Sequence, residues 1–393
     1  MKRIAKESIQ KPERFPASVL TKEKIEAAIH FVLKQIDKNL SCFPDAFPAP
    51  CSRGGVYPPA GNEDWTSSFR TGMLWLAYEV TGDAKYRAAA ERDIKSFVNR
   101  LDKQICLNTH DIGFLYTLSC VAASKITGDK AARRTALSAA DHLLDRYNEE
   151  AGVIQAWGNL EDPERQGCII IDCLMNLPLL YWAGQATGNS KCTFAARRHA
   201  QNSMEYLVRP DASTFHTFYM DVVTGKPKFG KTRQGYSDSS SWSRGQAWSI
   251  YGFPLSYAYT GDRSFLNVAV KTANYFLNRL PKDGICCWDL IFTDEKVQRD
   301  SSAAAIAVCG FLQLAKGINL LDPCRKIYEN AARFMVNSLI DGYLAEYGSS
   351  NGILLHGVYS IPENMGIDEC CIWGDYFFFE ALVRLSRDWS CYW

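Results

Sequence analysis

The tripeptide Thr-Gly-Asp, or its variant Thr-Gly-Asn, occurs four times in this chain, each time between an apolar stretch and an amphipathic one. Glycine fits the left-handed conformation that ends many helices, and Asp or Asn caps the helix that follows. Each triplet therefore predicts the tight turn of a helical hairpin, with Lys316-Gly317 followed by Asp322 as a looser fifth copy. The four triplets are Thr81-Gly82-Asp83, Thr127-Gly128-Asp129, Thr187-Gly188-Asn189 and Thr260-Gly261-Asp262.

Counting outward from these turns predicts roughly twelve helices in six pairs. The stretch before each triplet is apolar nearly all round, which is typical of a buried helix, whereas the stretch after it is amphipathic. This alternation favours an all-α fold, an (α/α)6 barrel of six helical hairpins. A flat α-solenoid is the alternative, but its repeats keep a tighter period. The predicted spans are 22–39, 65–81, 84–102, 110–127, 130–148, 168–187, 190–208, 243–259, 263–279, 301–317, 322–339 and 371–387.

Strand patterns are few and short, and nothing in the sequence divides the chain. Val153–Trp157, Thr217–Met220 and Gly284–Leu290 predict short strands in the loops between hairpins. No linker, charge run or low-complexity segment interrupts the helical pattern. We therefore expect a single (α/α)6-barrel domain over residues 1–393, with residues 1–20 as an N-terminal extension.

Composition narrows the classes of partner. The chain has 44 basic and 43 acidic residues, so it lacks the basic excess that binds nucleic acid. No uncharged apolar run is long enough to span a membrane, and the N-terminus lacks a signal-like apolar region. The 14 cysteines include no Cys-x-x-Cys pair and suggest reduced core thiols. We expect a cytoplasmic monomer or weak homodimer that binds neither nucleic acid nor membrane and needs no metal or cofactor.

Asp172 is the one charge in the apolar run Cys168–Trp182. A carboxylate in such surroundings is costly unless it is paired or protonated, and a carboxylic acid that stays protonated can donate its proton. Asp172 lies deeper in the predicted helix than a capping residue would. It is therefore the first candidate for a catalytic residue.

Other polar residues cluster at the N-terminal ends of the predicted inner helices. Because these helices all run the same way, their N-terminal ends should meet at one mouth of the barrel and form a site there. Each residue also has a structural interpretation, since the aspartates could be helix caps, the aromatics could be core and Arg244 could be ion-paired. The residues are Asp64, Trp65, His110, Asp111, Asp172, Arg244, Gln246, Trp248, Asp300, Asp368 and Glu369.

At these positions the chain resembles the unsaturated glucuronyl hydrolases of glycoside hydrolase family 88, from about residue 60 to its end. The matching segments are Asp64-Trp65-Thr66, His110-Asp111-Ile112-Gly113-Phe114, Ile170–Asn176, Phe215-His216-Thr217-Phe218, Gln234–Asp238, Trp242–Trp248, Arg299–Ala303 and Trp373–Tyr376. The resemblance implies an (α/α)6 barrel, in agreement with the helix count.

The resemblance also implies a reaction and roles for residues. The family removes a Δ4,5-unsaturated uronic acid from the non-reducing end of lyase products by hydrating its vinyl ether. By resemblance, Asp172 is the general acid and base, and Asp111 is the second catalytic aspartate, for which we expect an electrostatic role. The implied substrate contacts are Trp65, Trp157, His216, Gln234, Arg244 and Trp248, with no metal.

Three alternatives remain open at this point. An unsaturated rhamnogalacturonyl hydrolase has the same chemistry on pectin fragments. A sugar epimerase on this barrel wants a pair of catalytic histidines, and the chain has only six histidines. A non-catalytic saccharide-binding protein would use the same aromatics but has no reason to bury Asp172. The saccharide beyond the unsaturated uronate is not specified by the sequence.

Overall fold

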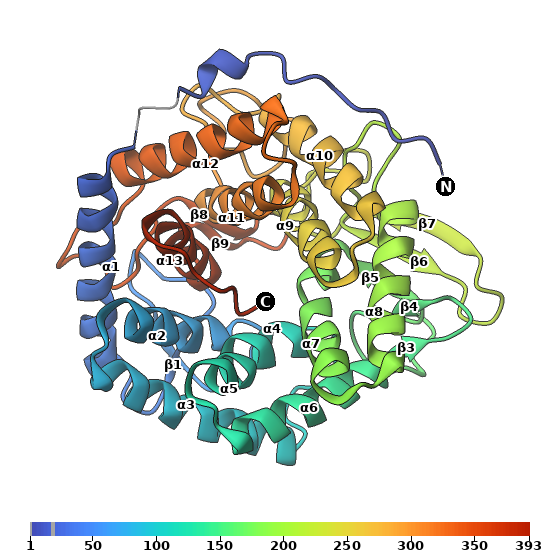
Figure 1. The fold of residues 1–393 in the computed structure, drawn as a ribbon, viewed down its shortest axis with the longest axis horizontal. Coiled ribbons are helices and arrows are strands. Elements are labelled where there is room, and N and C mark those ends of the chain that lie inside the picture. The colour runs from blue at the N-terminus through green and yellow to red at the C-terminus, as the bar shows by residue number, and fades with distance from the viewer. Residues whose placement is uncertain (1, 17–19) are drawn as a thin grey trace.

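Two concentric rings of helices make up the fold in the computed structural model, which describes residues 2–16 and 20–393 (Figure 1). The outer ring contains α1 (Lys22–Cys42), α3 (Ala84–Asp102), α6 (Lys130–Leu144), α8 (Ser190–Asn202), α10 (Arg263–Leu277) and α12 (Pro323–Gly342). The inner ring contains α2 (Ser67–Thr81), α4 (Ile112–Tyr116) with α5 (Ala122–Thr127), α7 (Leu177–Thr187), α9 (Ser243–Thr260), α11 (Ser301–Gly317) and α13 (Ile372–Ser386). The predicted (α/α)6 barrel is confirmed.

The four Thr-Gly-Asp/Asn triplets are the hairpin turns that the sequence predicted. In each one the glycine has a positive φ of 69–77° and ends an inner helix. The Asp or Asn that follows accepts a hydrogen bond from a backbone N–H in the first turn of the outer helix. The threonine hydroxyl donates to the carbonyl four residues earlier at 2.7 Å in all four copies. Asp322 caps α12 in the looser fifth turn.

The sixth helix pair joins the two ends of the chain rather than neighbours in sequence. Helix α13 lies on the inner ring beside α1 of the outer ring, so this pair closes the barrel (Figure 1). The segment after α13 then turns into the centre of the ring, where the indole of Trp393 stacks on Phe377 at 5.9 Å. At the other end, the described residues 2–16 run along the outside, where Glu7 pairs with Arg279.

Two inner segments differ from the predicted helices. The predicted helix 168–187 begins instead as strand β5 (Cys168–Ile170) and a 3-10 turn, η3 (Ile171–Met175), before α7 starts. The predicted helix 110–127 contains a π-helical turn, η2 (Thr117–Val121). Strand β5 forms because it pairs with β6, so a tertiary contact overrides the helical appearance of the apolar run.

The short strands lie in loops at the barrel rim. Strands β5, β6 (Thr217–Met220) and β7 (Pro227–Lys231) form an antiparallel sheet, and β8 (Gly357–Ser360) pairs with β9 (Met365–Glu369). The smaller pairs are β1 (Phe47–Pro48) with β2 (Pro59–Ala60) and β3 (Tyr147–Asn148) with β4 (Val153–Ile154). The predicted strand over Gly284–Leu290 is wrong, since that segment makes only isolated bridges.

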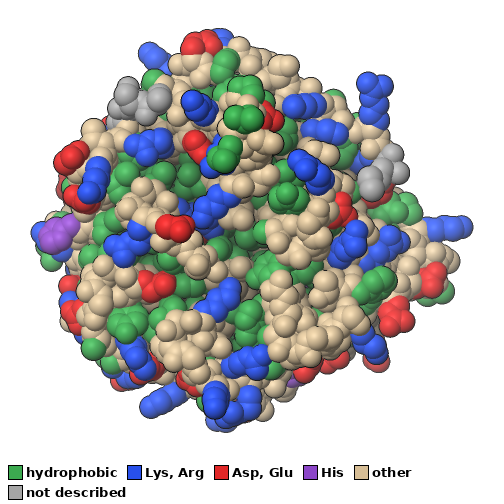
Figure 2. Space-filling view, viewed as in Figure 1, with side chains coloured by type: hydrophobic (Ala, Val, Ile, Leu, Met, Phe, Trp, Pro, Cys, Tyr) green, Lys and Arg blue, Asp and Glu red, His purple; other side chains and the backbone are tan. Residues whose placement is uncertain are grey.

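Lys and Arg side chains are interspersed with Asp and Glu across the face in Figure 2. Among residues 2–16 and 20–393, none of the helices has the length and apolar character that crossing a bilayer requires.

Candidate active site

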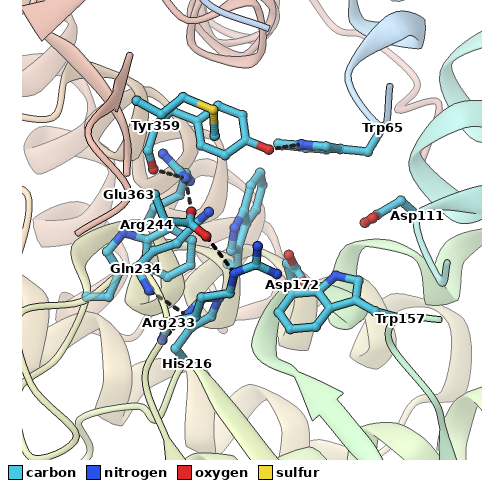
Figure 3. A pocket seen from close by; sticks show the side chains of 13 residues that line it. Trp65, Asp111, Trp157, Asp172, His216, Arg233, Gln234, Arg244, Tyr359 and Glu363 are labelled. Carbon is cyan, nitrogen blue, oxygen red and sulfur yellow. Dashed lines mark hydrogen bonds and ion pairs between the residues drawn. The ribbon is translucent and has the colours of Figure 1, made fainter. Parts of the chain in front are cut away.

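A cavity of about 370 Å³ lies at the mouth where the inner helices begin. It is lined by all eight residues to which the family resemblance gives a role: Trp65, Asp111, Trp157, Asp172, His216, Gln234, Arg244 and Trp248 (Figure 3, which labels all but Trp248). Of the other residues expected at this mouth, Asp64, His110, Gln246, Asp300, Asp368 and Glu369 do not line the cavity. They come from the starts of α2, α4 and α9, from turn η3 and from the rim loops. Trp65 and Trp248, which are 183 positions apart in sequence, therefore line the same cavity, as the parallel direction of the inner helices predicts.

Asp172 is less buried than the sequence suggested. Its neighbours in η3, including Ile171 and Cys173, are fully buried, but its own side chain is 19% exposed because the 3-10 turn directs it into the cavity. It is also paired, since its Oδ1 lies 3.3 Å from Nε2 of His110. The expectation of a carboxyl group buried in an apolar run is thus corrected to a carboxylate beside His110 at the edge of a cavity.

A close backbone contact brings Asp111 beside Asp172. A Cβ atom on Gly113 would lie 2.3 Å from Cα of Asn176, so only glycine permits this approach of α4 to the end of η3. The Asn176 side chain accepts a hydrogen bond from Phe114 N–H at 2.7 Å and fixes the contact. Asp111 lies two residues before Gly113, and Asp172 lies four residues before Asn176, so this contact brings the two aspartates together.

Asp111 stands at the start of α4 but does not cap the helix through its side chain. Its Oδ2 accepts a hydrogen bond from the Thr109 hydroxyl at 2.6 Å, and its Oδ1 lies 3.5 Å from Nε2 of His110. Burial raises the pKa of Asp111, His110 opposes that shift, and the carboxylate of Asp172 adds to it. The capping interpretation of Asp111 is therefore wrong.

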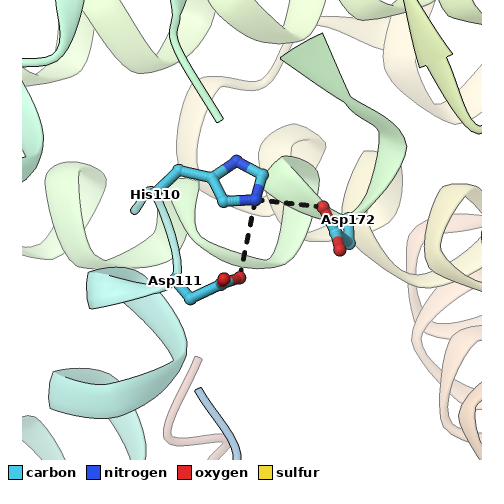
Figure 4. Close-up of side chains that lie close together, drawn as sticks. All are labelled: His110, Asp111 and Asp172. Carbon is cyan, nitrogen blue, oxygen red and sulfur yellow. Dashed lines mark ion pairs between the residues drawn. The ribbon is translucent and has the colours of Figure 1, made fainter. Parts of the chain in front are cut away.

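His110 lies between the two aspartates and is fully buried (Figure 4). Burial alone would lower its pKa, but the carboxylate of Asp111, together with Cys173 and Asp172, holds the pKa of His110 well above its usual value. A protonated imidazole at this position balances one of the two negative charges.

His216 is held in the opposite charge state. Its Nδ1 accepts hydrogen bonds from the backbone N–H groups of Arg233 and Gln234, at 3.0 and 3.2 Å. Burial lowers the pKa of His216 to about 3, so the ring is neutral. Because Nδ1 is an acceptor, Nε2 carries the proton and can donate to a ligand in the cavity.

Arg244 is fixed among aromatic rings at the back of the cavity. Its guanidinium lies over Trp242 and Trp373, at 4.4 and 4.7 Å from the ring centroids. It donates to the side-chain oxygen of Gln234 at 2.9 Å and to the backbone carbonyl of Tyr359 at 2.8 Å. Asp300 lies 3.8 Å away, so the ion-pair interpretation also holds in a weak form. The result is a preorganised positive charge facing the cavity.

The indole rings form two walls. The Trp65 Nε1–H donates to the Tyr359 hydroxyl at 2.9 Å, which fixes one wall, while Trp248 is buried against Phe114. Trp157 forms the opposite wall near the mouth, with the guanidinium of Arg233 at 4.8 Å over its ring. Flat rings facing a narrow cavity suit the apolar faces of a sugar.

Five residues that line the cavity were not predicted as site residues. Glu363 and Met365 lie on the β8–β9 hairpin, whose approach to the mouth no local pattern indicates. The five residues that were missed are Arg233, Trp242, Tyr359, Glu363 and Met365. His110 was expected at this mouth, but its contact with both aspartates was not predicted.

His110, Asp111 and Asp172 are also the one group among the described residues that could surround a metal ion, with donor atoms within 4.8 Å of one another. A protonated imidazole already supplies a positive charge there, so the absence of a metal stays our prediction. Treatment with EDTA should leave kcat/KM within about twofold of its untreated value, because the chelator would have no bound metal ion to remove from the site. Loss of activity that one divalent cation restores would contradict it.

Comparison with known proteins adds to this geometry. Residues 48–367 match Glycosyl Hydrolase Family 88. The chain is 47% identical to the unsaturated chondroitin disaccharide hydrolase of Streptococcus pneumoniae, with all of both chains covered. It is 46% identical to the crystal structure of an unsaturated glucuronyl hydrolase from Streptococcus agalactiae, with full coverage of both chains and a TM-score of 0.97. A variant of that enzyme complexed with dGlcA-GalNAc6S aligns with a TM-score of 0.90 and 43% identity, over 100% of both chains.

Proposed function

Because this chain belongs to glycosyl hydrolase family 88, we propose that its cavity removes Δ4,5-unsaturated glucuronic acid from a chondroitin-type disaccharide, with Asp172 as the proton donor. The enzyme is a glycosidase of the unsaturated glucuronyl hydrolase type. The chondroitin-type saccharide and the roles of individual residues are the proposal, and relatives in sequence and structure support the saccharide.

The chemistry is the hydration of a vinyl ether. A proton adds to C4 of the unsaturated sugar, and positive charge develops at C5, where the ring oxygen shares it. Water then adds to C5 and gives up a proton. The resulting hemiketal opens to a ketone at C5, which frees the aldehyde at C1 and releases the second sugar. One water molecule is consumed, and the enzyme recovers the proton that it donated.

Asp172 suits both proton transfers because its carboxyl faces the cavity beside a proton-bearing group. It donates a proton to C4 and, as a carboxylate, accepts the proton of the incoming water. Asp111, whose carboxylate accepts a hydrogen bond from Thr109 and lies beside His110, stabilises the positive charge at C5. No covalent sugar–enzyme bond is needed for either step.

The remaining residues bind and orient the sugar. Trp65, Trp157 and Trp248 present flat apolar faces to the ring. The neutral His216 donates from Nε2 to a sugar oxygen or to the carboxylate. Arg244, held by Gln234, provides the positive field for the uronate carboxylate.

The observation that carries the proposal is the placement of two carboxylates beside the same ring nitrogen, Nε2, of one buried histidine, at the edge of a cavity with aromatic walls. A binding protein needs the aromatic walls but not this arrangement. An epimerase would require two titrating histidines at the sugar, whereas His216 is neutral and His110 lies behind the aspartates.

A substrate panel tests the proposal. We expect the enzyme to abolish the enol-ether ultraviolet absorbance of unsaturated chondroitin disaccharides and to release free uronate without an epimer. Its kcat/KM for them should exceed that for unsaturated rhamnogalacturonan disaccharide by at least about tenfold, because the second sugar contacts the mouth of the cavity. Sulfated and unsulfated chondroitin disaccharides are included in the panel. A preference for the pectin fragment would contradict the proposal.

We also propose a location for the enzyme in the cell and an oligomeric state. All fourteen cysteines are free thiols, including Cys51 and Cys371, whose sulfur atoms lie only 3.5 Å apart, and this favours a reducing, cytoplasmic location. Enzyme found outside the cytoplasm on cell fractionation would contradict it.

The exposed large apolar side chains come from scattered segments, which favours a monomer or a weak homodimer. A stable higher oligomer in light scattering would overturn that assignment.

A further inference from the structure

We propose that His110 is a positioning residue that stores the catalytic proton between Asp111 and Asp172, and that the three side chains work as one protonated unit. The inference rests on the proposed function and adds a third member to the pair of aspartates. It explains how a carboxyl group that is open to the cavity keeps a proton available at neutral pH.

The geometry places His110 where it can serve Asp172 but not the sugar. Its ring is fully buried and does not line the cavity. Its Nε2 points at Asp172 Oδ1 and Asp111 Oδ1, at 3.3 and 3.5 Å (Figure 4), and both of these aspartates line the cavity. These distances are just beyond the hydrogen-bond range of about 2.7–3.2 Å, so a small movement closes either contact.

His110 is unusual because its ring is fully buried but forms no hydrogen bond with a neutral group in the described part of the chain. Among the described residues, neither ring nitrogen of His110 has a hydrogen-bond partner, and neither does Oδ1 of Asp172. A buried imidazole without hydrogen bonds is costly, whereas an imidazolium between two carboxylates is compensated. The contrast is His199, also fully buried, whose Nδ1 accepts a hydrogen bond from the backbone of Ile154 and whose pKa is lowered to about 3 by burial.

The other titratable groups around His110 are neutral. Cys173 of η3 and Cys168 of β5 are thiols whose pKa is raised by burial, and His199 of α8 is an uncharged imidazole. Further away, Arg146 interacts electrostatically with Asp111 and Cys173. Because burial raises the pKa of the Cys173 thiol, Cys173 acts on His110 only where that thiol ionises, and at neutral pH the two carboxylates govern the charge on His110.

The proton balance of the cycle follows from this arrangement. The active unit holds one proton, which rests on Nε2 of His110 while both aspartates are ionised. As Asp172 protonates C4, that proton passes from His110 to Asp172, and His110 becomes neutral. When water adds to C5, its released proton returns through Asp172 to His110. No proton is gained or lost over the cycle, and no other reactant is needed.

The variant His110→Gln tests this by its pH profile. In the wild-type enzyme the proton should stay bound through neutral pH, so kcat/KM should fall only on the alkaline side. In His110→Gln, Asp172 must hold the proton without help, and the alkaline limb should move toward acid by at least about one pH unit. We expect a loss in kcat of more than about tenfold at pH 8 that partly recovers toward pH 5, with little change in KM.

The matched control is His199→Gln, which removes the other fully buried histidine of this region without touching either aspartate. It should keep the wild-type alkaline limb. An equal loss at every pH in His110→Gln, with the limb unmoved, would overturn the proposal and leave His110 a structural residue. If wild-type enzyme fails to bleach any unsaturated disaccharide, it is the proposed function that fails instead.

A second measurement does not depend on the folding of a variant. In wild-type enzyme labelled with ¹⁵N at histidine, a doubly protonated ring signal from a buried histidine should persist at pH 8.5 in nuclear magnetic resonance spectra. If all six histidines are neutral at that pH, His110 does not store the proton and the proposal is wrong.

Discussion

The variant Asp172→Asn is expected to keep the fold and to lose at least about 10³-fold in kcat/KM, which corresponds to about 4 kcal/mol in the barrier. An amide cannot donate a proton to C4 or accept one from water. Because the carboxyl forms no hydrogen bond with other described residues, the substitution removes no bond that supports η3. The measurement is loss of enol-ether absorbance with the unsaturated chondroitin disaccharide, together with the thermal unfolding midpoint.

A control for general loss of acidic charge is Asp262→Asn. Asp262 caps an outer helix, α10, beyond the end of α9 opposite to the cavity residues Arg244 and Trp248, and Asn is an equally good cap. Its activity should stay near that of the wild type. If Asp172→Asn also turned over the disaccharide at nearly the wild-type rate, the assignment of Asp172 as the acid would be refuted.

The variant Asp111→Asn should lower kcat/KM by about 10²-fold or more, about 3 kcal/mol, through loss of the negative charge that faces C5. It also removes one of the two carboxylates that stabilise protonated His110. Since the amide oxygen of Asn can still accept the hydrogen bond from the Thr109 hydroxyl, a role limited to local structure predicts little change.

The comparison that decides between these roles is Asp129→Asn. Asp129 is a true cap, because its side chain accepts hydrogen bonds from the first turn of α6. We expect Asp129→Asn to match the wild type in both stability and kcat/KM. Equal behaviour of Asp111→Asn would return Asp111 to a structural role.

The barrel could be predicted because the residues that specify its hairpin turns are adjacent in the sequence. Each Thr-Gly-Asp/Asn triplet specifies the end of one helix and the cap of the next within three residues. The inner and outer rings then follow from which stretches are apolar all round. Strand β5 could not be predicted, because its pairing with β6 joins segments about fifty residues apart and the apolar run suits a helix equally well.

The site was predictable where it depends on helix direction and was missed where it depends on close contacts. Parallel inner helices brought Trp65, Asp111 and Arg244 to one mouth, as expected. The role of Gly113 as the contact that draws the aspartates together was not visible, because nothing in the sequence says that Asn176 lies opposite. The pairing of His110 with Asp172 depends on the same contact.

The β8–β9 hairpin illustrates a second limit. It carries Tyr359 and Glu363 to the cavity from the C-terminal part of the chain. Glu363 pairs with Arg233 at 2.8 Å, and that ion pair joins two loops 130 residues apart. Charges that meet only through the fold have no periodic signal in the sequence.

The central claim is that the enzyme hydrates the C4–C5 double bond rather than displacing the sugar at C1. Turnover in D₂O, followed from its first minutes by nuclear magnetic resonance, tests this most directly. Protonation by Asp172 from a fixed position predicts one deuterium on a single face of C4 in the released uronate. Release of a uronate that still contains the double bond, with deuterium entering both faces only afterwards, would contradict the account.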